Sequence, residues 1–248
     1  MLYCFPTILI LGETGTGKSS LCNVLAGRGP SSDLFPVSSG LASFTQKNVY
    51  QQIPFGGDEG FIVTAVDTKG FNDSNNKIDI DTVANFIASL KRRCSNVNVF
   101  GLTINEPKLD GPIGEMMKVF AEIFGPEFWQ HCILIFTKHT MDEKSKRKRK
   151  QHRKRSDNDF AETFISNLLK QIPYAGSLPY IFLDSWYDND EKDETKCFDE
   201  GLAVLAKSLN KSNRLETAGI TEKINPKRHE LKEKVPEATK KLDEIHLT

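Results

Sequence analysis

The sequence predicts one α/β domain in which helices cover both faces of a mostly parallel, six-stranded sheet. Two observations support this fold class: short apolar runs alternate with amphipathic helical patterns, and a glycine-rich loop follows the first apolar run. Such alternation is typical of parallel sheets, because two parallel strands need a crossover helix between them. A chain of 248 residues is long enough to bury one core of this kind.

The expected strands are short apolar runs bounded by turn-forming residues. They cover residues 7–11, 47–54, 61–66, 97–104, 132–137 and 180–183. Only a turn-rich stretch separates the second run from the third, so these two predict an antiparallel hairpin within the parallel sheet. The first run lacks the cationic start of a signal peptide, and we interpret it as a buried strand. No apolar run is long enough to cross a bilayer.

The expected helices carry large apolar residues three or four positions apart. They lie around residues 21–25, 83–94, 113–124, 160–172 and 198–209. Beyond residue 212 the chain is rich in Lys and Glu and poor in large apolar side chains. We therefore expect a domain over residues 1–212 and a charged extension over residues 213–248, helical or disordered, that forms no core of its own.

The glycine-rich loop is a complete match to the phosphate-binding pattern GxxxxGK[ST]. Its residues, with the serine that follows, are Gly12, Glu13, Thr14, Gly15, Thr16, Gly17, Lys18, Ser19 and Ser20. The glycines let backbone N–H groups and the start of a helix face phosphate oxygens. Lys18 is then expected to reach the β- and γ-phosphates, and the Ser19 hydroxyl to bind Mg²⁺. The loop predicts a site for a nucleoside triphosphate.

A second phosphate motif, DTKG at residues 67–70, follows the third expected strand. In this DxxG arrangement Asp67 holds Mg²⁺ through water, and the N–H of Gly70 senses the γ-phosphate. A Ser-rich segment precedes it, in which Thr45 is the expected hydroxyl ligand of Mg²⁺ in the triphosphate state. The predicted metal ligands are Ser19, Thr45 and Asp67, and the predicted catalytic residues are Lys18, Thr45 and Gly70.

These motifs resemble those of the immunity-associated nucleotide-binding (AIG-type) GTPases, relatives of septins and of chloroplast-import GTPases. The resemblance rests on GETGTGKSS, a Ser/Thr segment ending in FTQ, DTKGF, MMKVFAEIFG and ILIFT, and it covers about residues 5–210. It implies a Ras-like P-loop domain with extra helices that binds GTP or GDP with Mg²⁺ and hydrolyses GTP slowly. It also implies homodimers or oligomers formed across the nucleotide face, often on membranes.

The chain departs from the common GTPase pattern around the DxxG motif. Lys69 replaces the usual Pro, which should change the stiffness of the loop but not its chemistry. Ras-like proteins follow the glycine with a Gln that orients water, whereas this chain has Phe71. Slow turnover, or a catalytic group supplied by a partner, is therefore expected.

The base-recognition motif departs further. Where [NT]KxD is usual, the chain reads Thr137-Lys138-His139-Thr140, which leaves a threonine at the place of the aspartate that pairs with guanine. Asp142 is an alternative carboxylate if the loop shifts. The predicted base-contacting residues are Lys138 and His139 in this loop and Asp184 and Ser185 after the last strand. Trp186 could stack on the base.

Three functions remain open from the sequence. The leading one is a regulatory GTPase with slow hydrolysis that signals through nucleotide-dependent conformational change and assembly. The altered base motif and Phe71 also permit a non-hydrolysing nucleotide-binding scaffold, or a P-loop ATPase with relaxed base specificity. The hairpin and the placement of DxxG argue against a small-molecule kinase.

Charge is unevenly distributed although the formal net charge is zero. Residues 144–155 hold nine Lys and Arg and no acid, so the rest of the chain is net acidic. We expect a basic insertion over residues 143–156, either solvated or in contact with an anionic membrane surface. No aromatic residue is interleaved, which disfavours nucleic acid as a partner. The scattered cysteines suit a reduced cytosolic protein, so we expect a cytoplasmic location, or a peripheral one at a membrane.

Overall fold

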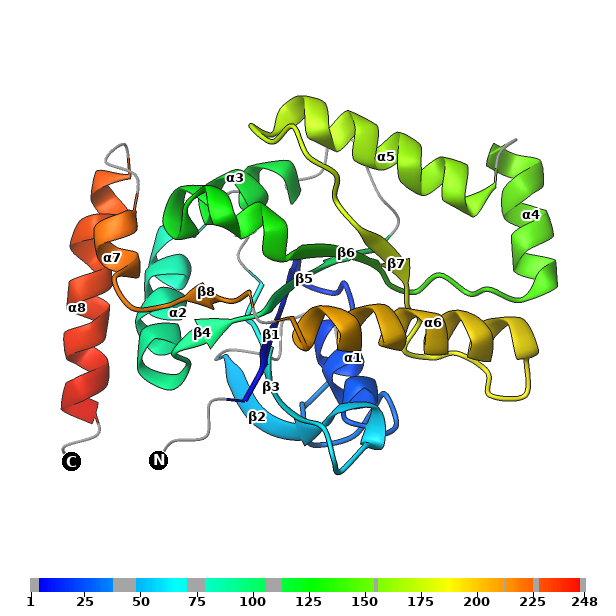
Figure 1. Ribbon diagram of the computed structural model, residues 1–248, viewed down its shortest axis with the longest axis horizontal. Coiled ribbons are helices and arrows are strands. Elements are labelled where there is room, and N and C mark those ends of the chain that lie inside the picture. The colour runs from blue at the N-terminus through cyan, green and yellow to red at the C-terminus, as the bar shows by residue number, and fades with distance from the viewer. Residues whose placement is uncertain are drawn as a thin grey trace.

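The computed structural model describes residues 5–37, 48–70, 79–105, 113–153, 156–211, 213–224 and 228–245. These residues contain a six-stranded sheet with strand order β2-β3-β1-β5-β6-β7, in which the β2–β3 pair is antiparallel and the other pairs are parallel (Figure 1). The strands are β1 (Thr7–Gly12), β2 (Val49–Pro54), β3 (Ile62–Asp67), β5 (Val99–Ile104), β6 (Cys132–Phe136) and β7 (Tyr180–Phe182). The predicted sheet with one antiparallel hairpin is confirmed.

Helices cover both faces of this sheet, as predicted. One face carries α2 (Ile80–Arg93), α3 (Ile113–Phe124) and α5 (Asp157–Gln171), and the other carries α1 (Lys18–Leu25) and α6 (Lys192–Leu209). Strand β1 contributes to the hydrophobic core on each face of the sheet. Leu9 and Leu11 pack on the side of α2, α3 and α5, and Ile8 and Ile10 on the side of α1 and α6. This alternation is what a strand buried on both faces requires.

The expected strand over residues 97–104 is divided in two. Its first part, β4 (Asn96–Val97), pairs antiparallel with β8 (Leu215–Glu216) in a separate small sheet. The break falls at the buried Asn98, whose Oδ1 accepts a hydrogen bond from the N–H of Thr7 (2.9 Å) and whose amide donates to the carbonyl of Leu209 (3.2 Å). The N–H of Asn98 still donates to the carbonyl of Thr7 (2.9 Å), so its side chain takes the place of one backbone acceptor only.

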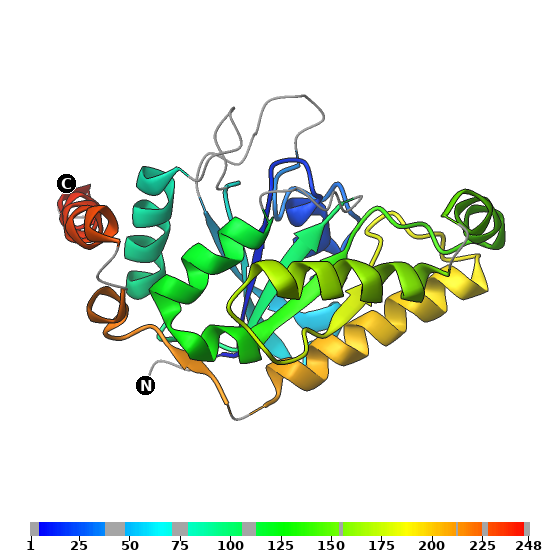
Figure 2. The same cartoon turned by 90° about the horizontal axis from the view of Figure 1, so that it is seen from above.

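The basic segment forms a helix, α4 (Glu143–Arg153). Lys and Arg are good helix formers, and Asp142 caps the start of the helix by accepting the N–H of Ser145 on its Oδ1 (2.9 Å). Figure 2 shows α4 at one end of the molecule and the last helix, α8 (His229–Ile245), at the other. None of the described helices is both long and apolar enough to cross a bilayer.

The C-terminal residues add to the domain core. Helix α8 packs along α2, and the fully buried Leu231 and Val235 join the core beneath α2 and α3. Ion pairs flank this contact, from Lys234 Nζ to Asp81 Oδ1 (2.8 Å) and from Arg92 Nη1 to Asp243 Oδ1 (2.9 Å). The connecting elements are η1 (Phe55–Gly57), η2 (Pro126–His131) and α7 (Ile220–Lys223).

Candidate nucleotide-binding site

The predicted phosphate and base residues meet at one edge of the sheet. Strands β1, β3, β5, β6 and β7 all run in the same direction, so the loops after them emerge side by side at their carboxyl ends. In open α/β sheets ligands bind outside this edge. The loops of interest begin at Gly12, Thr68, Thr137 and Leu183.

The phosphate-binding loop has the backbone that its glycines allow. Gly15 and Gly17 adopt left-handed conformations, with φ of +82° and +86°. A Cβ on Gly12 would lie 2.2 Å from Thr103 Oγ1, so a side chain does not fit there. Helix α1 begins directly after Gly17, and no side chain caps its first N–H groups. These N–H groups can therefore serve an anion.

Two threonines, Thr103 and Thr137, hold the loop in place. Thr103 Oγ1 lies 2.7 Å from Thr16 Oγ1 and donates to the carbonyl of Leu11 (3.0 Å). Thr137 Oγ1 donates to the carbonyl of Thr16 (2.7 Å). Both threonines are buried at the ends of apolar strands. Thr137 belongs to the expected base-recognition motif, whereas the lone hydroxyl at the end of an apolar strand was the signal that could have revealed Thr103.

Lys18 lies beneath the loop and is 7% exposed. Its Nζ donates to the carbonyl oxygens of Gly12 (3.0 Å) and Glu13 (2.7 Å). Burial lowers the pKa of Lys18 to about 8, against the opposing effect of Asp67. A desolvated ammonium group gains more from an anionic ligand than a hydrated one does.

Ser19 and Asp67, the two predicted Mg²⁺ ligands that the structure describes, lie in direct contact. Ser19 Oγ donates to Asp67 Oδ2 (2.6 Å), and the carboxylate is fully buried. Burial raises the pKa of Asp67 to about 6, while the bond from Ser19 and the charge of Lys18 act in the opposite sense. Among the described residues Asp67 Oδ1 has no hydrogen-bond partner. A hydroxyl and a carboxylate with an unused oxygen fit a hard, oxygen-preferring cation and its waters.

The DxxG segment packs directly against the phosphate loop. A Cβ on Gly70 would lie 2.4 Å from Thr14 Oγ1, so only glycine allows this approach. Thr68 anchors the segment by donating to the carbonyl of Ile10 (2.7 Å). Thr45 and Phe71 lie outside the described residues, so their roles stay predictions.

Lys138 reaches over the phosphate loop, where its Nζ donates to the carbonyl of Gly15 (2.8 Å). Its neighbour His139 points elsewhere: the imidazole stacks on the ring of Phe182 (4.6 Å between centroids), and Nε2 lies 3.2 Å from Asp157 Oδ1. Thr140 is exposed. Of the two residues predicted in this loop, Lys138 is thus joined to the phosphate site and His139 is turned toward α5.

The last loop brings a second carboxylate to this edge. Asp184 Oδ1 accepts the N–H of Trp186 (3.1 Å), while Ser185 is buried and the indole of Trp186 is exposed. Burial raises the pKa of Asp184, and Glu194 adds to this, whereas the bond from Trp186 and the charge of Lys138 lower it. Asp184 therefore lies within electrostatic reach of Lys138, across the two base loops.

Comparison with known proteins identifies the architecture. The model of the AIG1 family matches residues 6–233. Toc33 from Arabidopsis thaliana, solved with GDP and Mg²⁺, is 19% identical with a TM-score of 0.59, covering 86% of this chain and 88% of that one. A structure from a study of dimerization and GTPase activity in atToc33 and psToc159, components of the chloroplast translocon, is 18% identical with a TM-score of 0.60, covering 86% of both chains. No curated protein sequence matches significantly. The fold is that of a Ras-like P-loop G domain.

Proposed function

The chain belongs to the AIG1 family, and on this premise we propose that it is a regulatory GTPase that binds GTP and GDP with Mg²⁺. One observation carries the proposal: the buried Lys18, the Ser19–Asp67 pair and Lys138 converge on the same loop. Mg²⁺, held by Ser19 and through water by Asp67, would neutralise charge on the β- and γ-phosphates. The GDP and Mg²⁺ bound by Toc33, which shares the fold, support this choice of ligands.

We further propose that hydrolysis is slow and depends on assembly. Phe71 follows Gly70 and cannot orient water, so the chain alone lacks the usual Gln of this position. Dimerization has been described as important for the GTPase activity of atToc33 and psToc159. By analogy, a second copy of this chain across the nucleotide face would supply the missing group. Nucleotide state would then control assembly.

Titration with fluorescent GTP, GDP and ATP analogues, each with and without Mg²⁺, tests the proposal. We expect Mg²⁺-dependent binding of both guanine nucleotides and a hydrolysis rate per molecule that rises with protein concentration. Binding of GTP without turnover at any concentration would favour the non-hydrolysing scaffold. Equal affinity for ATP and GTP would favour the ATPase alternative, which the threonine at position 140 keeps open.

Thr140→Asp is expected to raise the preference for GTP over ATP by at least about tenfold. The contact of Lys138 with the phosphate loop supports this alignment, in which position 140 corresponds to the guanine-pairing aspartate of [NT]KxD. A carboxylate there accepts both N–H groups of the guanine edge and leaves adenine unpaired. Competition binding measures the ratio, with Thr140→Asn as the uncharged control. If Thr140→Asp leaves the ratio unchanged and Asp184→Asn removes the preference for GTP, Asp184 reads the base instead.

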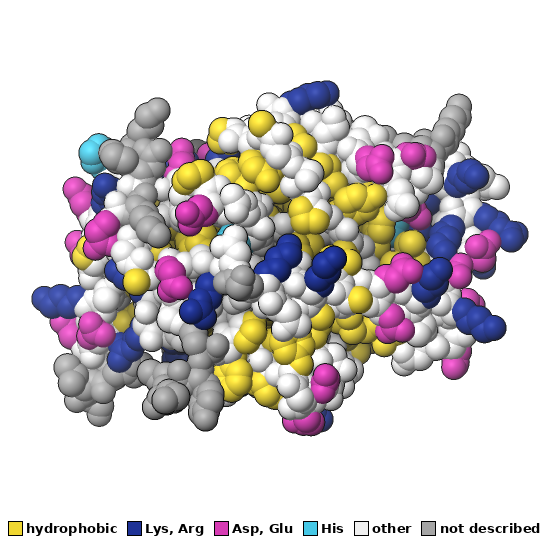
Figure 3. All heavy atoms as spheres, in the orientation of Figure 1, with side chains coloured by type: hydrophobic (Ala, Val, Ile, Leu, Met, Phe, Trp, Pro, Cys, Tyr) yellow, Lys and Arg dark blue, Asp and Glu magenta, His cyan; other side chains and the backbone are white. Residues whose placement is uncertain are grey.

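For the location we propose the cytoplasm, with α4 resting on anionic membrane surfaces. Figure 3 shows Lys and Arg side chains at the edge of the molecule where α4 lies, together with acidic ones. Lys146 is held by Asp193 (2.8 Å) and Arg149 by Asp157 (2.8 Å), so these two do not face a membrane freely. The exposed cations of the described part of α4 are Lys144, Arg147, Lys148 and Lys150.

Replacing these four cations by Gln is expected to weaken binding to phosphatidylserine vesicles by at least about tenfold at low salt. Each basic residue near headgroups contributes roughly 1 kcal/mol, discounted for those that point away. The matched control replaces four exposed lysines on or just after α6, namely Lys192, Lys196, Lys207 and Lys211. The difference should vanish near 1 M salt, where the Debye length is about 3 Å. If both variants float with the vesicles as well as wild type does, α4 is a solvated helix that does not bind membranes.

A further inference from the structure

Two carboxylates, the partly buried Asp157 and the buried Glu194, lie behind the loops that follow β6 and β7. Asp157 is the first residue of α5, and Glu194 lies in the first turn of α6. Neither belongs to a sequence motif, and both are far along the chain from Lys138. They are nevertheless tied to the predicted base loops by several contacts. A buried charge is costly unless it is well paired, so the partners indicate what these carboxylates do.

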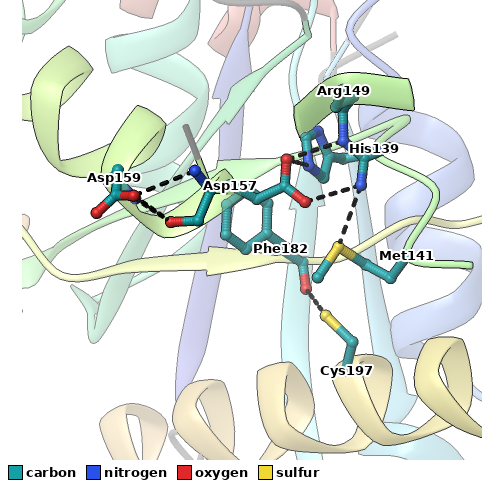
Figure 4. Close-up of polar contacts among 8 residues, drawn as sticks. His139, Met141, Arg149, Asp157, Asp159, Phe182 and Cys197 are labelled. Carbon is teal, nitrogen blue, oxygen red and sulfur yellow. Dashed lines mark hydrogen bonds and ion pairs between the residues drawn. The ribbon is translucent and has the colours of Figure 1, made fainter. Parts of the chain in front are cut away.

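Asp157 is linked to side chains of the loop after β6, residues 138–142, as Figure 4 shows. Arg149 forms a two-pronged ion pair with it, from Nε to Oδ1 (2.8 Å) and from Nη2 to Oδ2 (2.9 Å). His139 Nε2 lies 3.2 Å from Oδ1, and Arg149 Nη2 also contacts Met141 Sδ (3.8 Å). The side chains of His139, Asp157 and Arg149 are 10%, 13% and 17% exposed. Although burial alone would raise it, Arg149 and His139 hold the pKa of Asp157 below its usual range.

The backbone that Asp157 supports is strained. Lys138 has a φ of +54°, in the left-handed region, which is unfavourable for a residue with a Cβ. Such a conformation persists when its surroundings fix it. The next residue, His139, is fixed on one face by Phe182 and at its edge by Asp157. This anchoring keeps Lys138 directed at Gly15.

Glu194 ties the first loop to the second. Glu194 is 4% exposed. The two oxygens of its carboxylate accept hydrogen bonds from backbone N–H groups of different loops. Oε1 accepts from Asp142 (3.1 Å), and Oε2 accepts from Asp188 (2.6 Å). Hydrogen bonds to an ionised carboxylate are about twice as strong as neutral ones. One side chain therefore sets the spacing between the loop that starts at Lys138 and the loop that starts at Asp184.

We propose that Asp157 and Glu194 are positioning residues that fix residues 138–142 and 184–188 around the nucleobase and so set base affinity and selectivity. The inference rests on the proposed function, because it takes these two loops to hold the base. All four carboxylate oxygens already accept donors of the protein, so both residues act through the loops. A purely structural role would instead lower thermal stability and leave base selection unchanged.

The test compares Asp157→Asn and Glu194→Gln in their binding of Mg²⁺-GTP, Mg²⁺-ATP and inorganic triphosphate, well below the melting temperature. We expect GTP affinity to fall by about tenfold, equivalent to about 1.4 kcal/mol, while triphosphate affinity stays within about twofold. The ratio of GTP to ATP affinity should fall with it. Matched controls are Glu162→Gln on α5 and Glu200→Gln on α6, both exposed and expected to behave as wild type.

The outcomes distinguish failure of the proposed function from failure of the positioning roles of Asp157 and Glu194. A wild-type protein that binds triphosphate as tightly as GTP would overturn the proposed function itself. A wild-type protein that prefers GTP, with variants that keep the wild-type GTP-to-triphosphate ratio, would overturn the positioning roles whatever the melting temperatures are. Should a carboxylate variant fail to fold, Arg149→Lys provides the second probe. It keeps the charge on α4 but loses the two-pronged pair with Asp157, and the same selective loss of GTP affinity is expected.

Discussion

Replacing Lys18 by alanine is expected to weaken GTP binding by at least about a hundredfold. Removing one partner of a buried charge pair costs roughly 3–5 kcal/mol, and every 1.4 kcal/mol is a factor of ten. Lys18 is 7% exposed, and its Nζ already lies at the carbonyls that line the loop. Burial lowers its pKa to about 8, which means that the ammonium group is held at a cost in the nucleotide-free protein.

Lys18→Ala should therefore lower the affinity for GTP and leave the stability of the nucleotide-free protein nearly unchanged. Isothermal titration calorimetry with GTP measures the first, and thermal unfolding of the nucleotide-free protein measures the second. Lys211→Ala is the matched control, since this lysine is exposed and lies beyond the end of α6. An affinity for GTP that survives in the Lys18 variant would remove the phosphate site from this loop.

Asp67→Asn is expected to raise the thermal stability of the nucleotide-free protein while it abolishes the Mg²⁺-dependent gain in GTP affinity. The carboxylate is fully buried, its Oδ1 has no hydrogen-bond partner among the described residues, and burial raises its pKa to about 6. A shift of this size corresponds to about 3 kcal/mol. Because the amide still has to be buried, a gain of about 1–2 kcal/mol, or a few degrees, is expected.

The same residue gives stability a defined pH dependence. The folded-state pKa of Asp67 lies above the ordinary aspartate value of 3.8, so the native state binds the proton more tightly than the unfolded state does. Its contribution to stability is therefore complete below about pH 4 and is lost as the pH rises through about 6. Urea unfolding of wild type and Asp67→Asn across this window isolates the effect. A difference between the two proteins that does not change with pH would contradict the assignment.

The phosphate half of the site could be read from the sequence because its chemistry is local. Gly12 to Ser19 form one continuous loop between an apolar run and a helical pattern, and glycine is required where the backbone is left-handed or where Thr103 leaves no room. The sheet followed for the same reason, since each strand is a short apolar run ended by turn residues. Its β2–β3 hairpin needed only the turn between them.

The base half depends on contacts that no local pattern reveals. Asp157 and Glu194 look like ordinary first-turn acids of two helices, and only the tertiary fold brings them to His139, Asp142 and Asp188 of the two base loops. Arg149 is one of nine similar cations in its segment, and nothing in the sequence distinguishes the one that faces inward. The many charges of residues 213–248 left the sequence reading open between helix and disorder, although Leu231, Val235 and Ala238 of α8 have helical spacing and are buried.

The late position of α8 in the chain has a consequence for synthesis. The pair formed by Arg92 and Asp243 joins residues that are 151 positions apart. Chains emerge from the ribosome at about 5–20 residues per second, so α2 waits roughly 8–30 seconds for the helix that covers it. During that time the G domain has its strands and its phosphate loop but exposes an apolar helix face. Chaperones that bind nascent chains are expected to act on this protein at α2 until α8 has been synthesised and has packed against it.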